Sequence, residues 1–184
     1  MCADERQFER LLALHCAPVL KNRKASNMFH VEKDAFEDLH ATLALYHEKL
    51  EKKGICLRLF QQNKERVTVF VYRRRRLSLL LQREDVRVFL QRYGYPSLGL
   101  SEILDHLDRR LDEAEGYPHE IGVFLGYPLY DVEGFIEQRE CVMMGYWKVY
   151  RYPSAARRLF ALYDACIREL LNGLRCGQCI EQLI

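Results

Sequence analysis

Two features are missing from this sequence of 184 residues: a long hydrophobic run and a strong net charge. No apolar run approaches the roughly 20 residues that a helix needs to cross a bilayer, so we expect no membrane-spanning helix and no membrane partner. The 28 basic and 26 acidic side chains nearly cancel and leave a net charge of +2. The run Arg73–Arg76 is isolated and lacks the interleaved aromatic residues of a base-stacking platform, so we interpret it as a solvated face. We therefore do not expect nucleic acid as a partner.

A disulfide framework and a secretory leader are missing as well. The seven cysteines are odd in number and scattered along the chain, which is typical of reduced thiols. The start, from Met1 to Arg6, lacks the positively charged stretch and the apolar core of a secretory signal. These absences predict a cytoplasmic protein.

What the sequence does contain predicts one well-filled core. Hydrophobic residues make up 49% of the chain, as in ordinary globular proteins. We expect a single globular domain over residues 1–174. A C-terminal tail over residues 175–184, which carries the motif Cys176-x-x-Cys179, is expected to follow it.

The clearest strand signal is a pair of segments rich in β-branched and aromatic residues, at 55–60 and 67–72. The short polar connection between them predicts an antiparallel hairpin. A third strand is expected near 142–150, where Trp, Val and Tyr are enriched. Amphipathic patterns elsewhere predict helices. The expected fold is therefore α+β, with a small antiparallel sheet of about three strands packed against roughly six or seven helices.

The most unusual stretch runs from Gly116 to Glu137 and places two Gly-Tyr-Pro tripeptides around one apolar segment. Proline favours the first turn of a helix and glycine favours its end, so we expect a short helix over residues 118–126. His119 then lies at the positive end of the helix dipole, which disfavours the imidazolium. A neutral imidazole can act as a base or as a metal ligand.

A second unusual position is Cys16, near the end of an amphipathic helix that begins at Asp4. Pro18 is expected to break that helix and to place Cys16 at the positive start of a new turn. Lys21 and Lys24 are close in sequence. Both influences lower a thiol pKa and favour a reactive thiolate. The alternative is that Cys16 is a buried small hydrophobic residue.

Three sets of residues carry a recognisable pattern: His15–Pro18 with Lys24 and Phe29, Pro118–Pro128 with Asp131–Glu137, and Cys141 with Gly145–Tyr150. Together they resemble a family of uncharacterised bacterial proteins, found largely in anaerobic Firmicutes and known as DUF3793. The resemblance spans nearly the whole chain, and its most specific part is the central motif. It implies no established activity, so a site has to be argued from the residues themselves.

The candidate catalytic residues are Cys16, His119, Glu120 and Lys148. The leading hypothesis is a Cys/His site for metal, redox or small-molecule chemistry, in which Glu120 orients the site and Lys148 supplies positive charge. A thiolate with imidazole and carboxylate groups suits zinc or iron as a cofactor. The first alternative is a non-catalytic interaction or regulatory module, and the second is a papain-like thiol hydrolase. Whether the protein is an enzyme stays open.

Two further groups are candidates for binding. Tyr117, Tyr127 and Trp147 suit an apolar pocket for a planar cofactor or ligand, with aromatic core packing as the alternative. Cys176 and Cys179 have the spacing of half a metal site or of a redox dithiol, with an unstructured exposed tail as the alternative. The expected partner is a small molecule or a protein.

Overall fold

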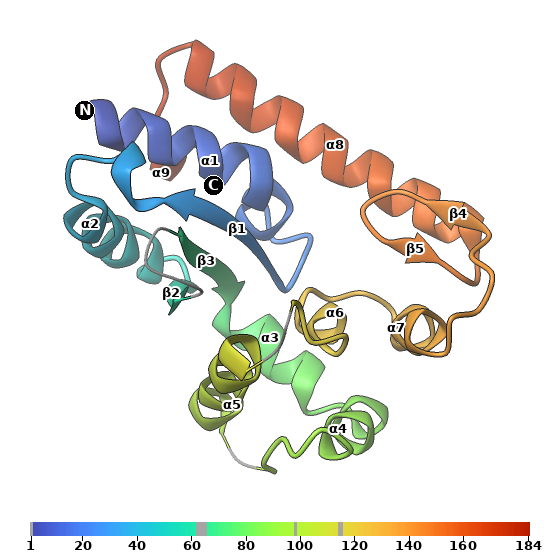
Figure 1. Cartoon of the computed structure of the whole chain (residues 1–184). Coiled ribbons are helices and arrows are strands. Elements are labelled where there is room, and N and C mark those ends of the chain that lie inside the picture. The colour runs from blue at the N-terminus through green and yellow to red at the C-terminus, as the bar shows by residue number, and fades with distance from the viewer. Residues whose placement is uncertain (1, 62–65, 98, 114–115) are drawn as a thin grey trace.

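The computed structural model describes residues 2–61, 66–97, 99–113 and 116–184, and Figure 1 shows how their elements are arranged. The strands are β1 (Ser26–Glu32), β2 (Ile55–Gln61), β3 (Arg66–Arg73), β4 (Met143–Met144) and β5 (Lys148–Val149). The helices are α1 (Ala3–Leu20), the 3-10 helix η1 (Lys33–Ala35), α2 (Leu39–Glu51), α3 (Arg74–Leu81), α4 (Glu84–Gln91), α5 (Leu100–Glu113), α6 (Ile121–Phe124), α7 (Leu129–Ile136), α8 (Pro153–Arg175) and α9 (Ile180–Leu183). Within these ranges, no helix combines the length and the apolar character needed to cross a membrane.

Three strands form the main sheet in the order β1-β3-β2, and both pairings are antiparallel. Val69, in the central strand β3, lies opposite Phe29 of β1 and Leu59 of β2. Such β-branched and aromatic side chains pack well on a pleated, buried surface. The predicted α+β fold and the hairpin β2–β3 are confirmed, although the described residues form nine α-helices instead of six or seven.

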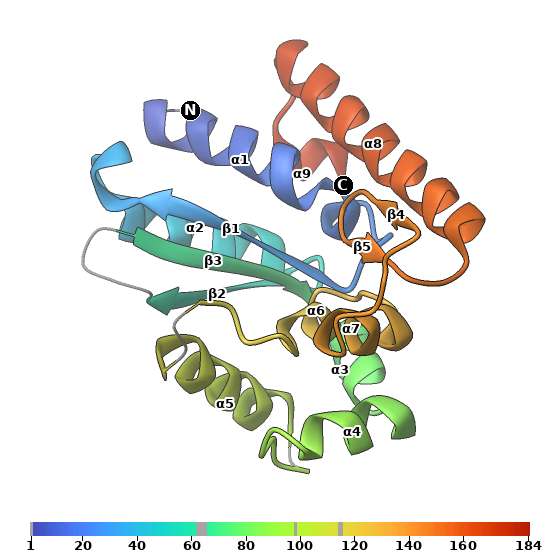
Figure 2. The same cartoon turned by 45° about the vertical axis from the view of Figure 1, so that its right-hand side comes forward.

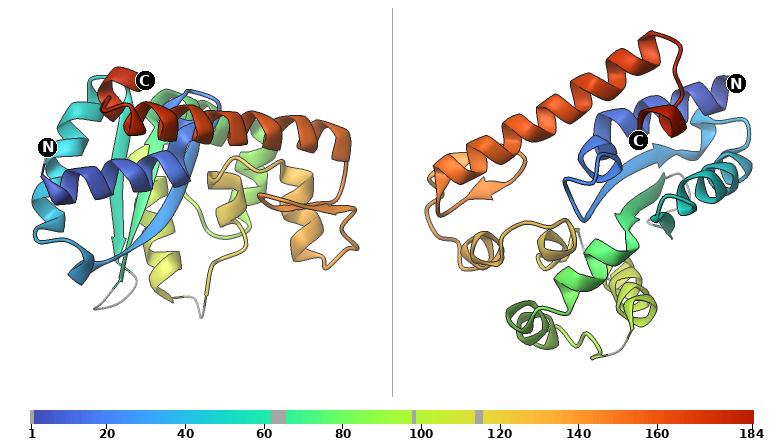
Figure 3. Two further views of the ribbon diagram at one scale, coloured as in Figure 1. Left: turned by 90° about the horizontal axis from the view of Figure 1, so that it is seen from above. Right: turned by 180° about the vertical axis from the view of Figure 1, so that it is seen from behind.

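The sheet separates two hydrophobic cores, because successive side chains of a strand point to opposite faces. Val67, Val69 and Val71 join a first core with α1, α2, α8 and α9. Phe70 joins a second core with α3 to α7. Figure 2 shows α1 above the sheet and α5 beneath it, and Figure 3 shows α8 lying along α1 on the outer side. A third, smaller cluster around Trp147 joins the β4–β5 hairpin to α8.

The third strand of the sheet is β1, so the prediction that segment 142–150 supplies it is wrong. That segment folds back on itself in the separate hairpin β4–β5, where Met143 pairs with Val149. Its aromatic residues pack on a helix instead of on a neighbouring strand: the Trp147 ring meets the Phe160 ring of α8 edge-on, with centroids 4.6 Å apart. The aromatic residues of segment 142–150 therefore indicate packing against a helix and not membership of the main sheet.

Helix α1 continues through Pro18 to Leu20, so the predicted break before Pro18 is wrong. A proline inside a helix removes one hydrogen bond and costs about 3 kcal/mol. Here the proline lies in the last turn, and the residues from Cys16 to Leu20 are almost completely buried. The main-chain N–H of Lys24 donates to the Pro18 carbonyl at 3.0 Å and closes the helix end. Burial of the last turn offsets the lost hydrogen bond.

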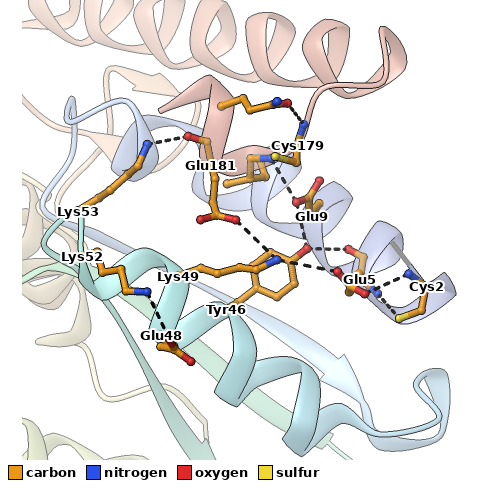
Figure 4. Close-up of polar contacts among 12 residues, drawn as sticks. Cys2, Glu5, Glu9, Tyr46, Glu48, Lys49, Lys52, Lys53, Cys179 and Glu181 are labelled. Atoms are coloured by element: carbon orange, nitrogen blue, oxygen red, sulfur yellow. Dashed lines mark hydrogen bonds and ion pairs between the residues drawn. The ribbon is translucent and has the colours of Figure 1, made fainter.

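The C-terminal segment packs into the first core, and Figure 4 shows its polar contacts. Ile180 is fully buried, and its N–H donates to the Glu9 carboxylate at 3.2 Å. The Tyr46 hydroxyl donates to the same oxygen at 3.0 Å. Lys53 donates to the main-chain carbonyl of Glu181 at 2.6 Å. Contacts from α1, from α2 and from the residues just after α2 therefore hold the segment in place.

Candidate functional site

The central motif forms the two short helices α6 and α7. α6 covers Ile121–Phe124, so it is shorter than the predicted helix over 118–126. The residues before it form a tight turn, in which the Ile121 N–H donates to the Pro118 carbonyl at 3.0 Å. Gly126 follows the helix with a φ of +72°, a conformation that glycine adopts without strain. The chain then turns at once into α7.

These helices and the β4–β5 hairpin enclose a cavity of about 400 Å³, which we call the aromatic cavity. Most of its lining is apolar. The aromatic and basic side chains that line it are Tyr117, His119, Tyr127, Phe135, Trp147 and Lys148. All of them except Phe135 are candidate site residues of the sequence analysis. The structure thus brings five candidates from three separate segments to one place.

Trp147 forms one wall of the aromatic cavity and is held by several contacts. Its ring stacks on the Tyr127 ring, with centroids 4.9 Å apart and planes inclined by 26°. Its indole N–H donates to the buried Asp131 carboxylate at 2.8 Å. The other oxygen of Asp131 accepts the main-chain N–H of Tyr150 at 2.7 Å. Asp131 therefore fastens the hairpin to α7, and a rigid wall of this kind needs little ordering when a ligand binds.

The basic groups of the aromatic cavity lie at its open side, because the side chains that carry them are exposed. The His119 ring meets the Phe135 ring edge-on at 5.2 Å between centroids. The Lys148 ammonium lies 5.3 Å from the centroid of the same Phe135 ring. In the described part of the chain, neither His119 nor Lys148 forms an ion pair or a side-chain hydrogen bond. Both groups are free to meet a polar group on a ligand.

Tyr117 connects the aromatic cavity to the main sheet. Its hydroxyl is hydrogen-bonded to the His30 ring of β1. The other ring nitrogen of His30 is hydrogen-bonded to the Thr68 hydroxyl of β3 at 3.0 Å. This relay fixes the position of Tyr117, although the loop that carries it has no regular secondary structure.

Cys16 does not line the aromatic cavity and lies fully buried in the first core. Burial raises the pKa of its thiol, and the nearby Lys24 offsets this only in part. The predicted lowering of the Cys16 pKa is therefore wrong, because α1 does not restart after Pro18. The alternative interpretation, a buried small hydrophobic residue, describes the position that the structure gives Cys16.

Glu120 is buried and also lies outside the lining of the aromatic cavity. Its carboxylate accepts the Nε hydrogen of Arg110 at 2.9 Å and the hydroxyl of Tyr95 at 3.4 Å. The hydrogen bond from Arg110 to Glu120 raises the pKa of that guanidinium. Among the described residues, the second carboxylate oxygen has no hydrogen-bond partner. Glu120 thus joins α6 to α5 and does not orient His119.

No group of three or more His, Cys, Asp or Glu side chains in the described ranges is arranged to hold a metal ion. Cys176 is exposed, Cys179 is half-buried, and both are free thiols. Cys179 is the N-cap of α9: its main-chain carbonyl accepts the N–H of Gln182 at 3.1 Å, and its own N–H donates to the Gln182 side chain at 2.9 Å. Cys179 thus already serves a structural purpose.

Several lining residues of the aromatic cavity were not identified as site residues from the sequence, among them Met28, Asp131 and Phe135. The signal for two of them was available, because Asp131 and Phe135 are four residues apart and share one face of α7. Met28 lies on β1, whose polar residues hide the strand pattern, so no local signal points to it.

The comparisons with known proteins give one match. The family model described as "Protein of unknown function (DUF3793)" matches residues 12–184. No curated protein and no solved structure matches the chain. The family match covers the second hydrophobic core, the aromatic cavity, the C-terminal segment and the first core except for its residues in the first turns of α1. The chain therefore belongs to the DUF3793 family.

Proposed function

We propose that this protein binds a small planar molecule that carries an acidic group, in the aromatic cavity. One observation carries the proposal: Tyr117, His119, Tyr127, Trp147 and Lys148 converge on a single apolar cavity of about 400 Å³. Ligand pockets of roughly 300–1,000 Å³ with apolar walls and few polar groups are typical of small-molecule sites. The cavity matches this description in size and in chemistry.

The aromatic walls provide most of the binding free energy. Offset stacking between rings contributes about 0.5–1.5 kcal/mol beyond the burial of apolar area. An exposed ion pair contributes about 0–1 kcal/mol, so Lys148 adds little affinity. Its role is to orient an acidic group toward the open side, next to His119. The ligand class is therefore defined first by a flat apolar body and second by its anionic end.

Binding is supported better than nucleophilic catalysis. A thiol hydrolase needs an accessible thiolate beside an imidazole, whereas Cys16 is fully buried and its pKa is raised. A catalytic imidazole also needs an orienting partner, whereas Glu120 is engaged by Arg110 and Tyr95. We do not propose metal chemistry for the aromatic cavity, because no group of three or more His, Cys, Asp or Glu side chains in the described ranges is arranged to hold an ion.

A second candidate function is an interaction module, in which the aromatic cavity receives an aromatic side chain of a protein. Two exposed apolar residues of the same hairpin favour it: Val142 is 57% exposed and Met144 is 71% exposed. Exposed apolar residues beside a pocket are common at protein interfaces. The two candidates differ in whether a free small molecule binds without this exposed surface.

The test uses Trp147, which is the single tryptophan of the chain. The protein is titrated with 1-naphthoate and with the uncharged 1-naphthalenemethanol, and binding is followed by tryptophan fluorescence and by calorimetry. We expect saturable binding of both compounds, tighter for the carboxylate. Tyr127→Leu, which removes the stacking partner of Trp147, should weaken both by about tenfold.

The matched control is Tyr130→Leu, because Tyr130 is a tyrosine of α7 that does not line the aromatic cavity. It should leave both affinities unchanged. Equal weakening by the two substitutions, or no saturable binding of either compound at millimolar concentration, would contradict the small-molecule proposal. A Val142→Ser, Met144→Ser variant that binds both compounds normally would separate the cavity from the exposed surface of the interaction module.

A further inference from the structure

A second cavity, of about 730 Å³, lies between the end of α1, the start of α3 and the outer helix α8. We call it the basic cleft. Its basic lining residues are Arg23, Lys24, Lys53, Arg73, Arg75 and Arg76. Among the described residues, no acidic side chain lines it, and Leu159 and Tyr163 of α8 form an apolar wall. A concave surface with cations of one sign concentrates anionic ligands.

Two of these cations are already engaged with main-chain carbonyls. Arg73 donates to the Val19 carbonyl at 2.7 Å, at the end of α1, and to the Lys53 carbonyl at 3.2 Å. Lys53 in turn donates to the Glu181 carbonyl at 2.6 Å. These two side chains build the frame of the basic cleft. A ligand must be met by the remaining cations.

Arg75 and Arg76 are exposed cations of the cleft, and both lie in the first turn of α3. In the described part of the chain, neither guanidinium has an ion pair or a side-chain hydrogen bond. Their neighbour Arg74 differs, because it lies outside the cleft lining and pairs with Glu51 at 2.8 Å. Burial, and then repulsion from Arg76, lower the pKa of Arg73. The charges that face the cleft thus repel one another.

The start of α3 adds to this positive field. The first turn holds Arg74, Arg75 and Arg76, it contains no acidic residue, and no side chain caps its N–H groups. The N-terminal end of a helix is the positive end of its dipole and favours anions, so three guanidinium groups there are unfavourable. An anion in the basic cleft would interact favourably with both the helix dipole and the three guanidinium groups.

Lys24 provides the second, independent observation. Its side chain is 5% exposed, and it lines the basic cleft. Its ammonium donates to Asn27 at 2.8 Å and lies over the rings of Tyr127 and Tyr163, at 5.3 and 5.7 Å from their centroids. In the described chain no carboxylate pairs with it. A buried ammonium without a counter-ion is costly unless a ligand supplies the negative charge.

We propose that the basic cleft binds the phosphate group of a small organic phosphate. Arg75 and Arg76 hold the phosphate oxygens at the positive end of α3, and the buried Lys24 adds a third positive charge. Guanidinium groups bind phosphate through two parallel hydrogen bonds, which suits this arrangement. The apolar wall of Leu159 and Tyr163 accommodates the organic part of the ligand.

A small phosphate fits better than a nucleic acid. The cations line one concave cavity instead of a stripe along the surface, and its lining offers one aromatic side chain, Tyr163, which is buried. Recognition of single-stranded nucleic acid uses several exposed rings along a groove. The basic cleft shares no lining residue with the aromatic cavity, so the proposal does not depend on the function proposed for that cavity.

The test is a calorimetric titration of the full chain with inorganic phosphate, pyrophosphate, adenosine monophosphate and a single-stranded DNA 12-mer. We expect saturable binding of pyrophosphate and of the nucleotide. Arg76→Gln should weaken both by at least about tenfold, as expected for one lost charge-assisted hydrogen bond. Arg74→Gln removes the same charge from the same helix turn outside the cleft and should change the affinities less than about twofold.

Three outcomes would contradict the proposal. Equal weakening by Arg74→Gln and Arg76→Gln would mean non-specific attraction to the arginine run. Tighter binding of the DNA 12-mer than of the small phosphates would favour a nucleic-acid surface. Absence of saturable binding at 10 mM of every phosphate would leave the cleft without this function. The 1-naphthoate titration, repeated on Arg76→Gln, should be unchanged, so that failure at one cavity is distinguished from failure at the other.

Discussion

The aromatic cavity and the basic cleft differ in how the buried charge at each is paired. Beside the aromatic cavity, the buried carboxylate of Asp131 accepts hydrogen bonds from Trp147 and Tyr150. In the basic cleft, the buried ammonium of Lys24 has one hydrogen bond and two aromatic contacts, and no carboxylate of the described residues pairs with it. A satisfied buried charge fixes structure, whereas an unsatisfied one is a position where a ligand gains free energy. The comparison therefore assigns rigidity to the first cavity and affinity for charge to the second.

The largest expected effect is on the aromatic cavity. Asp131→Ala leaves the buried N–H groups of Trp147 and Tyr150 without acceptors, so we expect it to lower the free energy of unfolding by about 3 kcal/mol. Urea unfolding followed by Trp147 fluorescence measures this loss. Asp112→Ala, an exposed acidic residue of α5, is the control and should lie within about 0.5 kcal/mol of wild type. A small loss for Asp131→Ala would remove the contrast between the two cavities.

In the basic cleft we expect the reverse: removal of the buried charge of Lys24 should raise the free energy of unfolding. Burial lowers the pKa of Lys24 to about 8. In the unfolded chain the pKa is near 10.4, so the unfolded chain binds more protons between these values, and wild-type stability rises with pH through that window. At pH 7 the buried charge destabilises the fold. Lys24→Met should therefore stabilise the protein by about 1–3 kcal/mol at pH 7, and should gain progressively less between about pH 8 and 10.

Urea unfolding of Lys24→Met at a series of pH values checks this prediction. Lys52→Met, at a lysine whose side chain is 73% exposed, is the matched control and should show no pH-dependent gain. The same Lys24→Met variant should lose pyrophosphate binding. A variant that is more stable and still binds pyrophosphate would show that Lys24 is not part of the phosphate site.

A smaller effect is expected at the open side of the aromatic cavity. Lys148→Gln should weaken 1-naphthoate by about two- to fivefold and leave 1-naphthalenemethanol unchanged, because an exposed ion pair contributes at most about 1 kcal/mol. Calorimetry with both compounds separates the contribution of the ligand's charge to affinity from that of its apolar ring. Equal weakening of the two compounds would mean that Lys148 acts by packing on Phe135 and not by its charge.

The smallest expected effect concerns the C-terminal thiols. Serine is a good N-cap, so Cys176→Ser, Cys179→Ser should change the free energy of unfolding by less than about 0.5 kcal/mol. We propose that the reduced pair also binds a soft metal ion, such as zinc. Protein purified without oxygen should then carry metal that the double variant lacks. Equal metal content in the two proteins would contradict metal binding by these thiols.

The sequence predictions were accurate where a feature depends on neighbouring residues and inaccurate where it depends on contacts between residues far apart in the sequence. The hairpin β2–β3 was predictable because its β-branched residues and polar connection are consecutive. Most of the aromatic cavity was predictable because the central motif supplies much of its wall. The residues of strand β1 are compatible with either a loop or a short strand, since Ser26, Asn27 and His30 interrupt its apolar pattern.

The basic cleft could not be predicted from neighbouring residues either, because it depends on contacts between distant parts of the chain. The run Arg73–Arg76 was interpreted as a solvated face, and the exposure of Arg74, Arg75 and Arg76 agrees with that. The position of Lys24 beside them depends on how α1, β1 and α3 pack together, which no nearby residue encodes. Cys16 was misjudged because a tertiary contact, the burial of the last turn of α1, overrode the local effect of Pro18.

The two cores on either side of the sheet also differ in the order in which a ribosome delivers them. Every buried residue of the second core lies between Phe60 and Val132. The first core needs Phe8 and Leu12 from α1 together with Leu170 and Ile180, which are synthesised much later. Contacts between distant parts of a chain form slowly. During translation the residues of the second core are therefore all present while the first core still lacks α8 and α9, which complete it last.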